Sequence, residues 1–229
     1  MDLPLLYPLK DLSSVSVGLI TIEVVELASK RANALDGSLP LKILNSFCPK
    51  VKEEQVKEIA LIDAHRILIA AWRQTYDSSG YVAKLNCPSC NKLTLLTHDL
   101  TKSVSASPVY SQVHKLKAKD PDTLQPREFN IELAPLKFNV QCELLKMAIN
   151  EQEDWAKILF DRRIKSVDGK PYTDPRLMSM PLFKAIGELI KDDVQAINSL
   201  LNEEGKCSHC EESVSSQLGI MDGNFLQSL

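Results

Sequence analysis

The stretch Cys87-Pro88-Ser89-Cys90 decides how this chain must fold, together with a distant counterpart, Cys207-Ser208-His209-Cys210. Two cysteines spaced by two residues on a tight turn can present both thiolates to one metal ion, and zinc takes four such ligands in a tetrahedron. Each pair therefore supplies half of a complete site. The two halves are separated by 116 residues, so only the tertiary structure can join them. We predict one zinc ion bound by four cysteines, Cys87, Cys90, Cys207 and Cys210.

The sequence also allows three other interpretations of the cysteine pairs. They are a redox disulfide within one pair, two pairs that never meet, and free thiols in turns. A thioredoxin-like pair begins a helix after a strand, whereas the first pair stands between two strand-like runs. His98 and His209 lie close enough in sequence to replace a cysteine ligand, although a surface position is the simpler expectation. Cys48 and Cys142 are expected to be small, partly buried apolar residues.

The composition is that of an ordinary globular protein of one large domain or two small ones. The 229 residues are 44% hydrophobic and 25% charged. The longest strongly apolar run, Ile67–Trp72, is far shorter than the roughly 20 residues of a membrane span, so no span is expected. The start of the chain lacks the basic and apolar regions of a secretory signal. A reducing compartment is then the default, which favours metal over disulfide for C-x-x-C pairs.

The sequence offers no sign of catalytic chemistry. It contains none of the glycine-rich phosphate loops, and neither H-E-x-x-H nor G-x-S-x-G. A zinc ion held by four thiolates has no open coordination position, so its role is structural. The formal net charge of −3 disfavours nucleic acid as the main partner. We therefore expect a non-enzymatic binding or scaffold protein.

Hydrophobic periodicity predicts two long helices, Asp63–Tyr76 and Pro181–Leu201. Asp63 is expected to cap the start of the first one. Arg66 and Arg73, seven residues apart, share a face of that helix. We expect this face to be solvated, and contact with an anion or carboxylate is the alternative.

Shorter elements complete an α+β fold, in which helices pack on short antiparallel hairpins and one structural zinc joins the two C-x-x-C knuckles. A helix precedes such a hairpin twice, which is consistent with a duplicated unit. The remaining predicted helices are Glu23–Leu35 and Phe138–Ile164, the latter broken near Asn150, and Leu39–Phe47 is a short apolar segment. The predicted strands are Val15–Ile22, Tyr81–Leu85, Leu93–Thr97, Phe129–Leu133 and Glu211–Gln217, with a turn at Val167–Pro171.

The chain divides into five segments. Residues 1–14 are expected to form an extended N-terminal arm, and 15–100 a helical region that ends in the first zinc knuckle. Residues 101–128 are polar and predict a loop or insert. Residues 129–217 contain a strand, helices and the second knuckle. The tail, 218–229, keeps enough apolar residues to dock on a partner.

Three lysines alternate within the polar segment, at Lys115, Lys117 and Lys119. An extended chain would place them on one side. We expect a solvated face, and contact with an acidic partner is the alternative.

The run Leu61–Tyr76, LIDAHRILIAAWRQTY, is followed by the first cysteine pair and then by His98-Asp99-Leu100. This order resembles the baseplate hub proteins of contractile-tailed, T-even-like bacteriophages, over residues 15–100 well and 129–217 loosely. The resemblance implies a non-enzymatic structural or assembly component of the tail baseplate hub. Its partners would be other hub proteins, and it would occupy the host cytoplasm during assembly and then the virion. The polar segment and the apolar tail depart from the family pattern.

Two other classes remain as alternatives, a zinc-ribbon nucleic-acid-binding module and an enzyme with a purely structural zinc. The first needs basic and aromatic residues beside the knuckles. The second knuckle is instead flanked by Glu203-Glu204 and Glu211-Glu212, which repel phosphate, and only Lys84 and Lys92 flank the first. An enzyme would need a pocket with a further group of polar residues.

Overall fold

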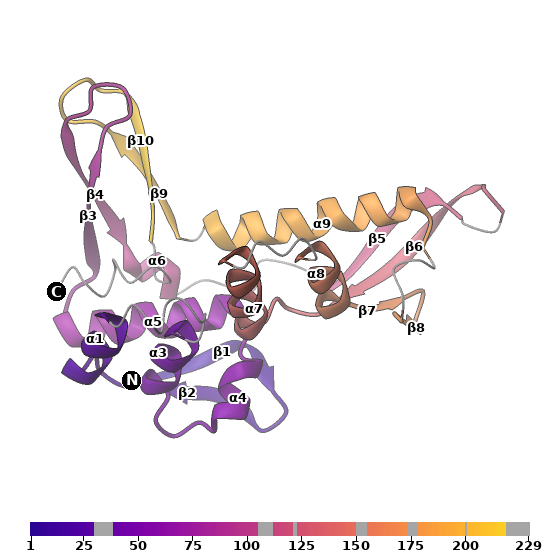
Figure 1. Ribbon diagram of the computed structural model, residues 1–229, viewed down its shortest axis with the longest axis horizontal. Helices are drawn as coiled ribbons and strands as arrows, with labels where there is room; N and C mark the ends of the chain where they lie inside the picture. The colour runs from indigo at the N-terminus through magenta and orange to yellow at the C-terminus, as the bar shows by residue number, and fades with distance from the viewer. Residues whose placement is uncertain are drawn as a thin grey trace.

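The computed structural model describes residues 1–29, 39–104, 112–120, 123–149, 155–173, 178–199 and 201–218. Figure 1 shows an N-terminal body, two hairpins that project from it side by side, and a long helix that leads from the hairpins to a small sheet. All strand pairs in the described residues are antiparallel, in three two-stranded sheets and one four-stranded sheet. The predicted mixture of helices with short antiparallel hairpins is confirmed.

The N-terminal body is built around one buried helix, α5 (Leu61–Tyr76). Every residue from Leu61 to Ala71 is buried, because apolar side chains surround this part of the helix. The other elements of this body are β1 (Asp2–Leu9), β2 (Leu12–Ser16), α1 (Ile22–Ser29), α3 (Leu39–Phe47), α4 (Glu53–Glu58), α6 (Leu100–Val104) and α7 (Phe138–Ile149), of which β1, α3, α6 and α7 contact α5. The helix predicted at Asp63–Tyr76 is confirmed, and Leu39–Phe47 is also helical.

The arm expected at residues 1–14 is in fact part of a hairpin that packs on α5. Strand β1 pairs with β2, and its alternate residues Leu3, Leu5 and Tyr7 are buried. This period of two is the mark of a half-buried strand. The strand expected at Val15–Ile22 is correspondingly misplaced, since β2 already ends at Ser16.

Asp63 fixes this hairpin to α5 and does not cap the helix. The N-cap residue is Ala60. Asp63 is fully buried, and its carboxylate accepts hydrogen bonds from the backbone N–H groups of Leu6, at 2.8 Å, and Tyr7, at 3.0 Å. The prediction that Asp63 begins the helix as its cap is therefore wrong.

Arg66 is buried against the same carboxylate. Its Nη1 lies 2.8 Å from Oδ1 of Asp63 and donates to the carbonyl oxygen of Pro4 at 3.0 Å. Only 5% of Arg66 is exposed, so the solvated face expected for it is wrong. The anion it contacts is a carboxylate of the chain itself. Arg73, which lies in the last turn of α5, is half-buried.

The helices of the second half agree with the prediction in outline. Helices α7 and α8 (Trp155–Arg163) divide the region predicted as one broken helix, and α9 (Met180–Ser199) matches the second long helix. The predicted break at Asn150 and the end of the first predicted helix, residues 30–35, lie outside the described residues.

The loop predicted for residues 101–128 is wrong for the residues of this segment that the structure describes, which are mainly helix and strand. The segment contributes α6, β5 (Val113–Lys119) and the start of β6 (Pro126–Leu133), and the sheet continues through β7 (Ile164–Val167) and β8 (Lys170–Pro171). The inner face of this four-stranded sheet packs on α8 and α9. The residues in this contact include Phe129, Ile131, Phe160, Ile186 and Ile190. A strand covered on one face needs few apolar residues, which is why its composition reads as polar.

The three lysines of β5 lie on its exposed face, as expected. The ammonium group of Lys115 is 3.3 Å from the carboxylate of Glu128 on the neighbouring strand. Whether this face also meets an acidic partner stays a prediction.

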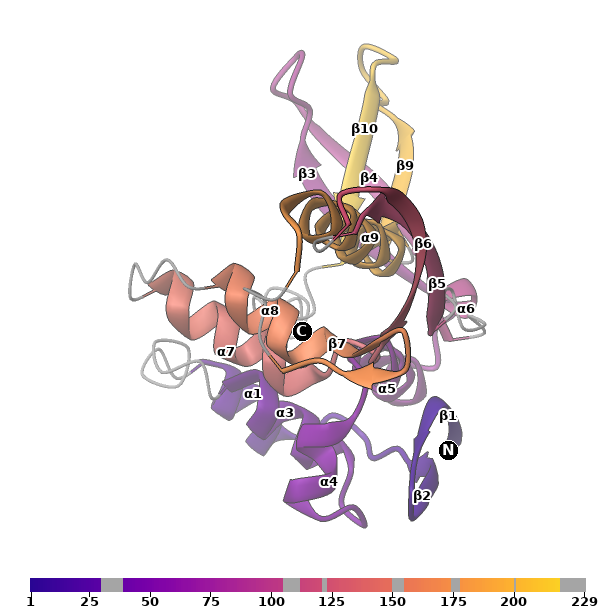
Figure 2. The same ribbon diagram turned by 90° about the vertical axis from the view of Figure 1, so that its right-hand side faces the viewer.

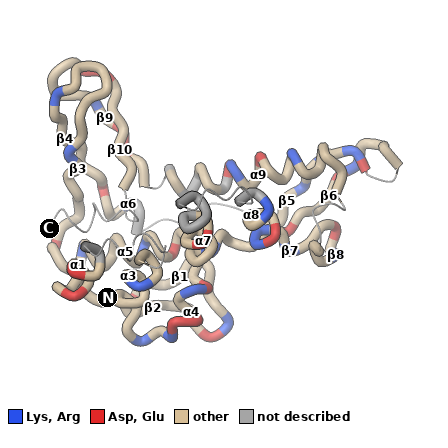
Figure 3. Tube along the Cα trace, viewed as in Figure 1, with Lys and Arg blue, Asp and Glu red and all other residues tan. Residues whose placement is uncertain are grey.

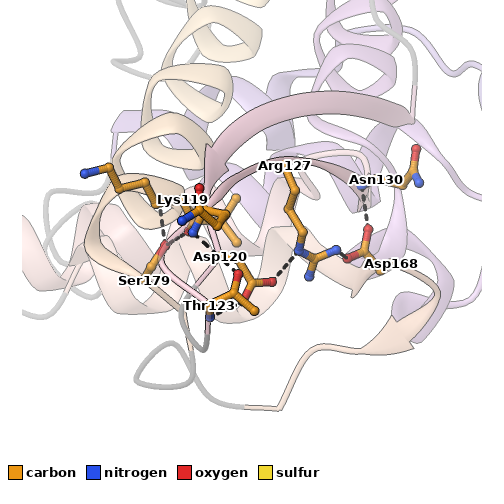
Figure 4. A network of polar contacts seen from close by, with 9 residues as sticks. Lys119, Asp120, Thr123, Arg127, Asn130, Asp168 and Ser179 are labelled. Carbon is orange, nitrogen blue, oxygen red and sulfur yellow. Dashed lines mark hydrogen bonds and ion pairs between the residues drawn. The ribbon is translucent and has the colours of Figure 1, made fainter.

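Arg127 joins two turns of the four-stranded sheet (Figure 4). Its guanidinium donates to Asp120 and, at 2.7 Å, to Asp168. Asp168 also accepts a bond from the backbone N–H of Asn130 and lies in the turn between β7 and β8, with φ 51°. The turn predicted at Val167–Pro171 is therefore confirmed, and a surface ion-pair network holds it in place.

Candidate metal centre

Two hairpins carry the cysteine pairs at their tips. Strand β3 (Gly80–Asn86) pairs with β4 (Leu93–Asp99), and β9 (Asn202–Lys206) pairs with β10 (Ser213–Gln217). Strands β4 and β9 contact each other, and Figures 1 and 2 show the two tips lying together. The predicted hairpins around both pairs are confirmed, and the reading in which the pairs never meet is wrong.

The two loops have the same conformation. In each, the first cysteine donates its N–H to the residue five positions on, and its carbonyl accepts from the residue four positions on. That fourth residue has a left-handed backbone in both loops, Asn91 with φ 56° and Glu211 with φ 61°. The bonds are Cys87 N to Lys92 O at 2.9 Å, Asn91 N to Cys87 O at 2.8 Å, Cys207 N to Glu212 O at 2.8 Å, and Glu211 N to Cys207 O at 3.0 Å.

The structure brings the four predicted cysteines into one cluster. Their Sγ atoms all lie within 4.8 Å of one another, with Cys87 3.6 Å from Cys210 and Cys90 3.7 Å from Cys207. Cys87 and Cys207 are buried. All four thiols are free. This arrangement can hold one metal ion.

The charges of the cluster favour a cation at its centre. A hydrogen bond from the backbone N–H of His209, with N···Sγ 3.4 Å, is the largest of the contacts that lower the pKa of Cys207, to about 6. At Cys210 a backbone hydrogen bond from Glu212 lowers the pKa, but desolvation and the neighbouring thiols outweigh it and raise the pKa to about 12. Sulfur atoms this close cannot all be thiolates without a positive charge among them. A metal ion held by the four sulfur atoms would supply that charge.

Neither histidine belongs to the cluster. The ring Nε2 of His209 lies 3.2 Å from the carbonyl oxygen of Leu93 and so ties the second loop to β4. His98 is buried between the hairpins beside Tyr81, with ring centroids 6.1 Å apart, and burial lowers its pKa. The cluster found among the described residues consists of cysteines alone.

Two residues that sequence reasoning missed hold the hairpins together. Thr94, which is buried, accepts a hydrogen bond from the backbone N–H of Ser208 at 3.3 Å. Gly205 of β9 packs directly against Leu96 of β4, because a Cβ there would stand 2.6 Å from Cδ1 of Leu96 and that side chain would have to shift. A glycine inside a short strand was the available signal for this close approach.

The other two cysteines take no part in the centre. Cys48 and Cys142 are both buried, more completely than expected. Burial raises the pKa of Cys48 to about 12, so its thiol stays protonated and unreactive at neutral pH.

The strained loop residue Glu211 provides a test of the loop conformation. Glu211→Gly should stabilise the chain by about 1 kcal/mol, because a residue with a Cβ is disfavoured at this φ and glycine is not. Asn91→Gly should change stability less, since asparagine tolerates the left-handed region. Urea denaturation of the two variants measures the difference. Destabilisation by Glu211→Gly would contradict the loop geometry.

No protein-family model matches the chain, and no curated protein or solved structure matches it either. The resemblance to baseplate hub proteins therefore stays a prediction. The interpretation of the centre rests on its geometry and on the chemistry of its four thiols.

Proposed function

We propose that the four cysteines hold one structural zinc ion, which locks the two hairpins together in a non-enzymatic, protein-binding component. The observation that carries the proposal is the four-sulfur cluster. A tetrahedral zinc ion with Zn–S distances of about 2.3 Å places its sulfur ligands about 3.8 Å apart. The separations of 3.6 and 3.7 Å across the hairpins agree with this spacing. Four ligands leave no position for substrate, so the ion serves the fold.

We further propose that this component belongs to the baseplate hub of a contractile phage tail, where it binds other hub proteins. Support comes from the sequence of α5, the first cysteine pair and the segment His98-Asp99-Leu100, taken in that order. The elements that carry these features are linked by contacts, since α6 packs on α5 and touches β3, while the cysteine pair itself stands at the tip of the β3–β4 hairpin. The chain would act in the host cytoplasm during assembly and then become part of the virion.

The surroundings of the cysteines do not favour the nucleic-acid alternative. Figure 3 shows charges of both signs on the two hairpins. The acidic residues Glu204, Glu211 and Glu212 are exposed beside the second pair. A phosphate-binding surface needs a positive field instead.

The cavity at the end of α5 has a polar lining, which the enzyme alternative requires, but it lacks the side chains that act most often as general base or thiol nucleophile. This cavity has a volume of about 340 Å³, and the described residues that line it, Arg73, Gln74 and Asp77 among them, include neither histidine nor cysteine. Among the described helices, none combines the length and apolar character that crossing a membrane requires.

Metal content per chain tests the zinc proposal. Reduced, purified protein should contain one zinc ion, and chelation should make four thiols reactive while Cys48 and Cys142 react only after unfolding. Replacement by Co²⁺ should give the absorption bands of a tetrahedral thiolate site. Absence of bound metal, with the paired cysteines oxidised, would overturn the structural-zinc proposal in favour of redox chemistry.

Co-expression with the hub proteins of a T-even-like tail tests the assembly role. The zinc-loaded chain should sediment with them as a complex of defined stoichiometry, and mass spectrometry of purified tails should detect it. A zinc-loaded chain that sediments alone would overturn the hub role and leave the structural zinc in place.

A further inference from the structure

The outer faces of the two hairpins differ although their loops share one conformation. The outer face of β3–β4 exposes three apolar residues: 49% of Val82, 56% of Leu93 and 59% of Leu95 are accessible. Counted from the first cysteine of each pair, the corresponding residues of β9–β10 are Asn202, Ser213 and Ser215, all exposed. The same backbone thus carries an apolar surface on one hairpin and a polar one on the other.

The three apolar residues form one continuous patch. Leu93 and Leu95 are two apart on β4 and share a face. Lys84 of β3 stands directly opposite Leu95, and Val82 stands opposite Thr97, diagonal to Leu95. Directly opposite side chains contact each other across an antiparallel pair, and a diagonal position lies within reach of a long side chain such as that of leucine. We call Val82, Lys84, Leu93 and Leu95 the outer patch.

The fold does not require the outer patch to be apolar. The contacts with the second hairpin come from the opposite face of β4, where Thr94, Leu96 and His98 are buried. The corresponding outer positions of β9–β10 show that serine and asparagine suit this backbone. A group of neighbouring exposed apolar residues that the fold does not use is available for binding another molecule.

The charges of the patch indicate the chemistry of that molecule. Lys84 lies within the patch and Lys92 precedes Leu93 at its edge. Among the described residues, neither ammonium group has an ion pair or hydrogen bond. The carboxylate of Asp99, at the base of the hairpin, accepts both the N–H and the hydroxyl of Thr101. A binding partner would therefore match the patch with apolar side chains and carboxylates.

We propose that the outer patch binds an apolar and acidic segment of another protein. A face seven residues long and two strands wide covers about 24 by 10 Å. This is well below the roughly 800 Å² per partner of a stable dimer interface, so the patch alone does not pair two copies. It contains no aromatic side chain on which a nucleic-acid base would stack. The inference rests on the protein-binding role proposed above, and does not depend on the hub identity.

Selection from a displayed library of random 16-residue peptides on the zinc-loaded chain tests the proposal. Enriched peptides should combine leucine-like residues with Asp or Glu, and a synthetic copy should bind. The double variant Leu93→Ser/Leu95→Ser carries the residues of the second hairpin at these positions. It should keep its zinc and its denaturation midpoint but bind the peptide at least tenfold more weakly. Lys84→Glu should also weaken binding, and more so at low salt.

The matched control is Ser213→Ala/Ser215→Ala on the second hairpin, which should leave peptide binding unchanged. The proposal is overturned if no acidic and apolar peptides are enriched, or if the serine variant binds them as tightly as the parent chain.

Three other results would assign the outer patch to a different occupant. Self-association of the parent chain that is lost in the serine variant would assign the patch to a second copy. If the parent chain binds a labelled single-stranded oligonucleotide and the serine variant does not, the patch would be assigned to nucleic acid. Tighter peptide binding after removal of residues 219–229 would assign it to the chain's own tail. Loss of zinc from the parent chain would instead count against the proposed function.

Discussion

Replacing Cys87 or Cys207 with serine should destabilise the chain to the same degree, by more than about 4 kcal/mol. The free energy of structural zinc binding adds directly to folding and reaches on the order of 10 kcal/mol at such sites. The two cysteines come from different hairpins but belong to one cluster within 4.8 Å. Removal of either one therefore opens the same site. Urea denaturation with parallel zinc analysis measures both effects.

The double variant Cys87→Ser/Cys207→Ser should be hardly less stable than either single variant, because the site is already lost in each. Cys48→Ala is the control for loss of a buried thiol. It should cost only about 1 kcal/mol and leave the zinc content intact. Additive losses, or tolerance of one serine and not the other, would show that the two pairs do not share a metal ion.

Asp63→Asn should cost about 3 to 5 kcal/mol, the usual result of leaving one member of a buried ion pair without its partner. The substitution keeps the size of the side chain but removes the charge that neutralises Arg66, which is 5% exposed. It also weakens the acceptor for the backbone N–H groups of Leu6 and Tyr7. Chemical denaturation gives the total loss of stability.

Hydrogen exchange distinguishes this local role from general unfolding. In Asp63→Asn the amides of Leu6 and Tyr7 should exchange faster, while zinc content stays at the parent level because the centre lies at the far end of the hairpins. The double variant Asp63→Asn/Arg66→Met should recover part of the stability, since it removes the unpaired charge. Arg73→Met, on the same helix, is the control and should have a small effect. Unchanged exchange at the two amides would contradict the role assigned to Asp63.

The solvated face predicted for Arg66 is wrong for a simple reason. Spacing along a helix tells which residues share a face, but it does not tell what covers that face. The covering element here is β1, whose residues lie 56 to 62 positions before their partners Asp63 and Arg66. Its alternation of Leu3, Leu5 and Tyr7 was present in the sequence, but two prolines within the segment concealed it.

The loop predicted for residues 101–128 is wrong for a related reason. Val113–Lys119 contains three lysines, and a strand with only one buried face needs no more apolar residues than Leu116 and Ala118 provide. The partner strand β6 and helix α9 supply the rest of that core. Composition alone therefore favoured a loop where the structure has an edge strand.

The sequence by itself determined the two long helices of this protein, the two cysteine turns and the four cysteines of its candidate metal centre. The apolar residues of α5 and α9 recur at helical spacing, and the C-x-x-C spacing produces the same turn twice because each turn is closed by its own backbone hydrogen bonds. Only the tertiary structure decided which residues meet across long separations. It placed the two cysteine pairs together, buried Asp63 and Arg66 beneath the N-terminal hairpin, and left Leu93 and Leu95 on an open face. These outcomes depend on the packing of β4 against β9 and of β1 against α5, and local periodicity does not tell which elements pack on each other.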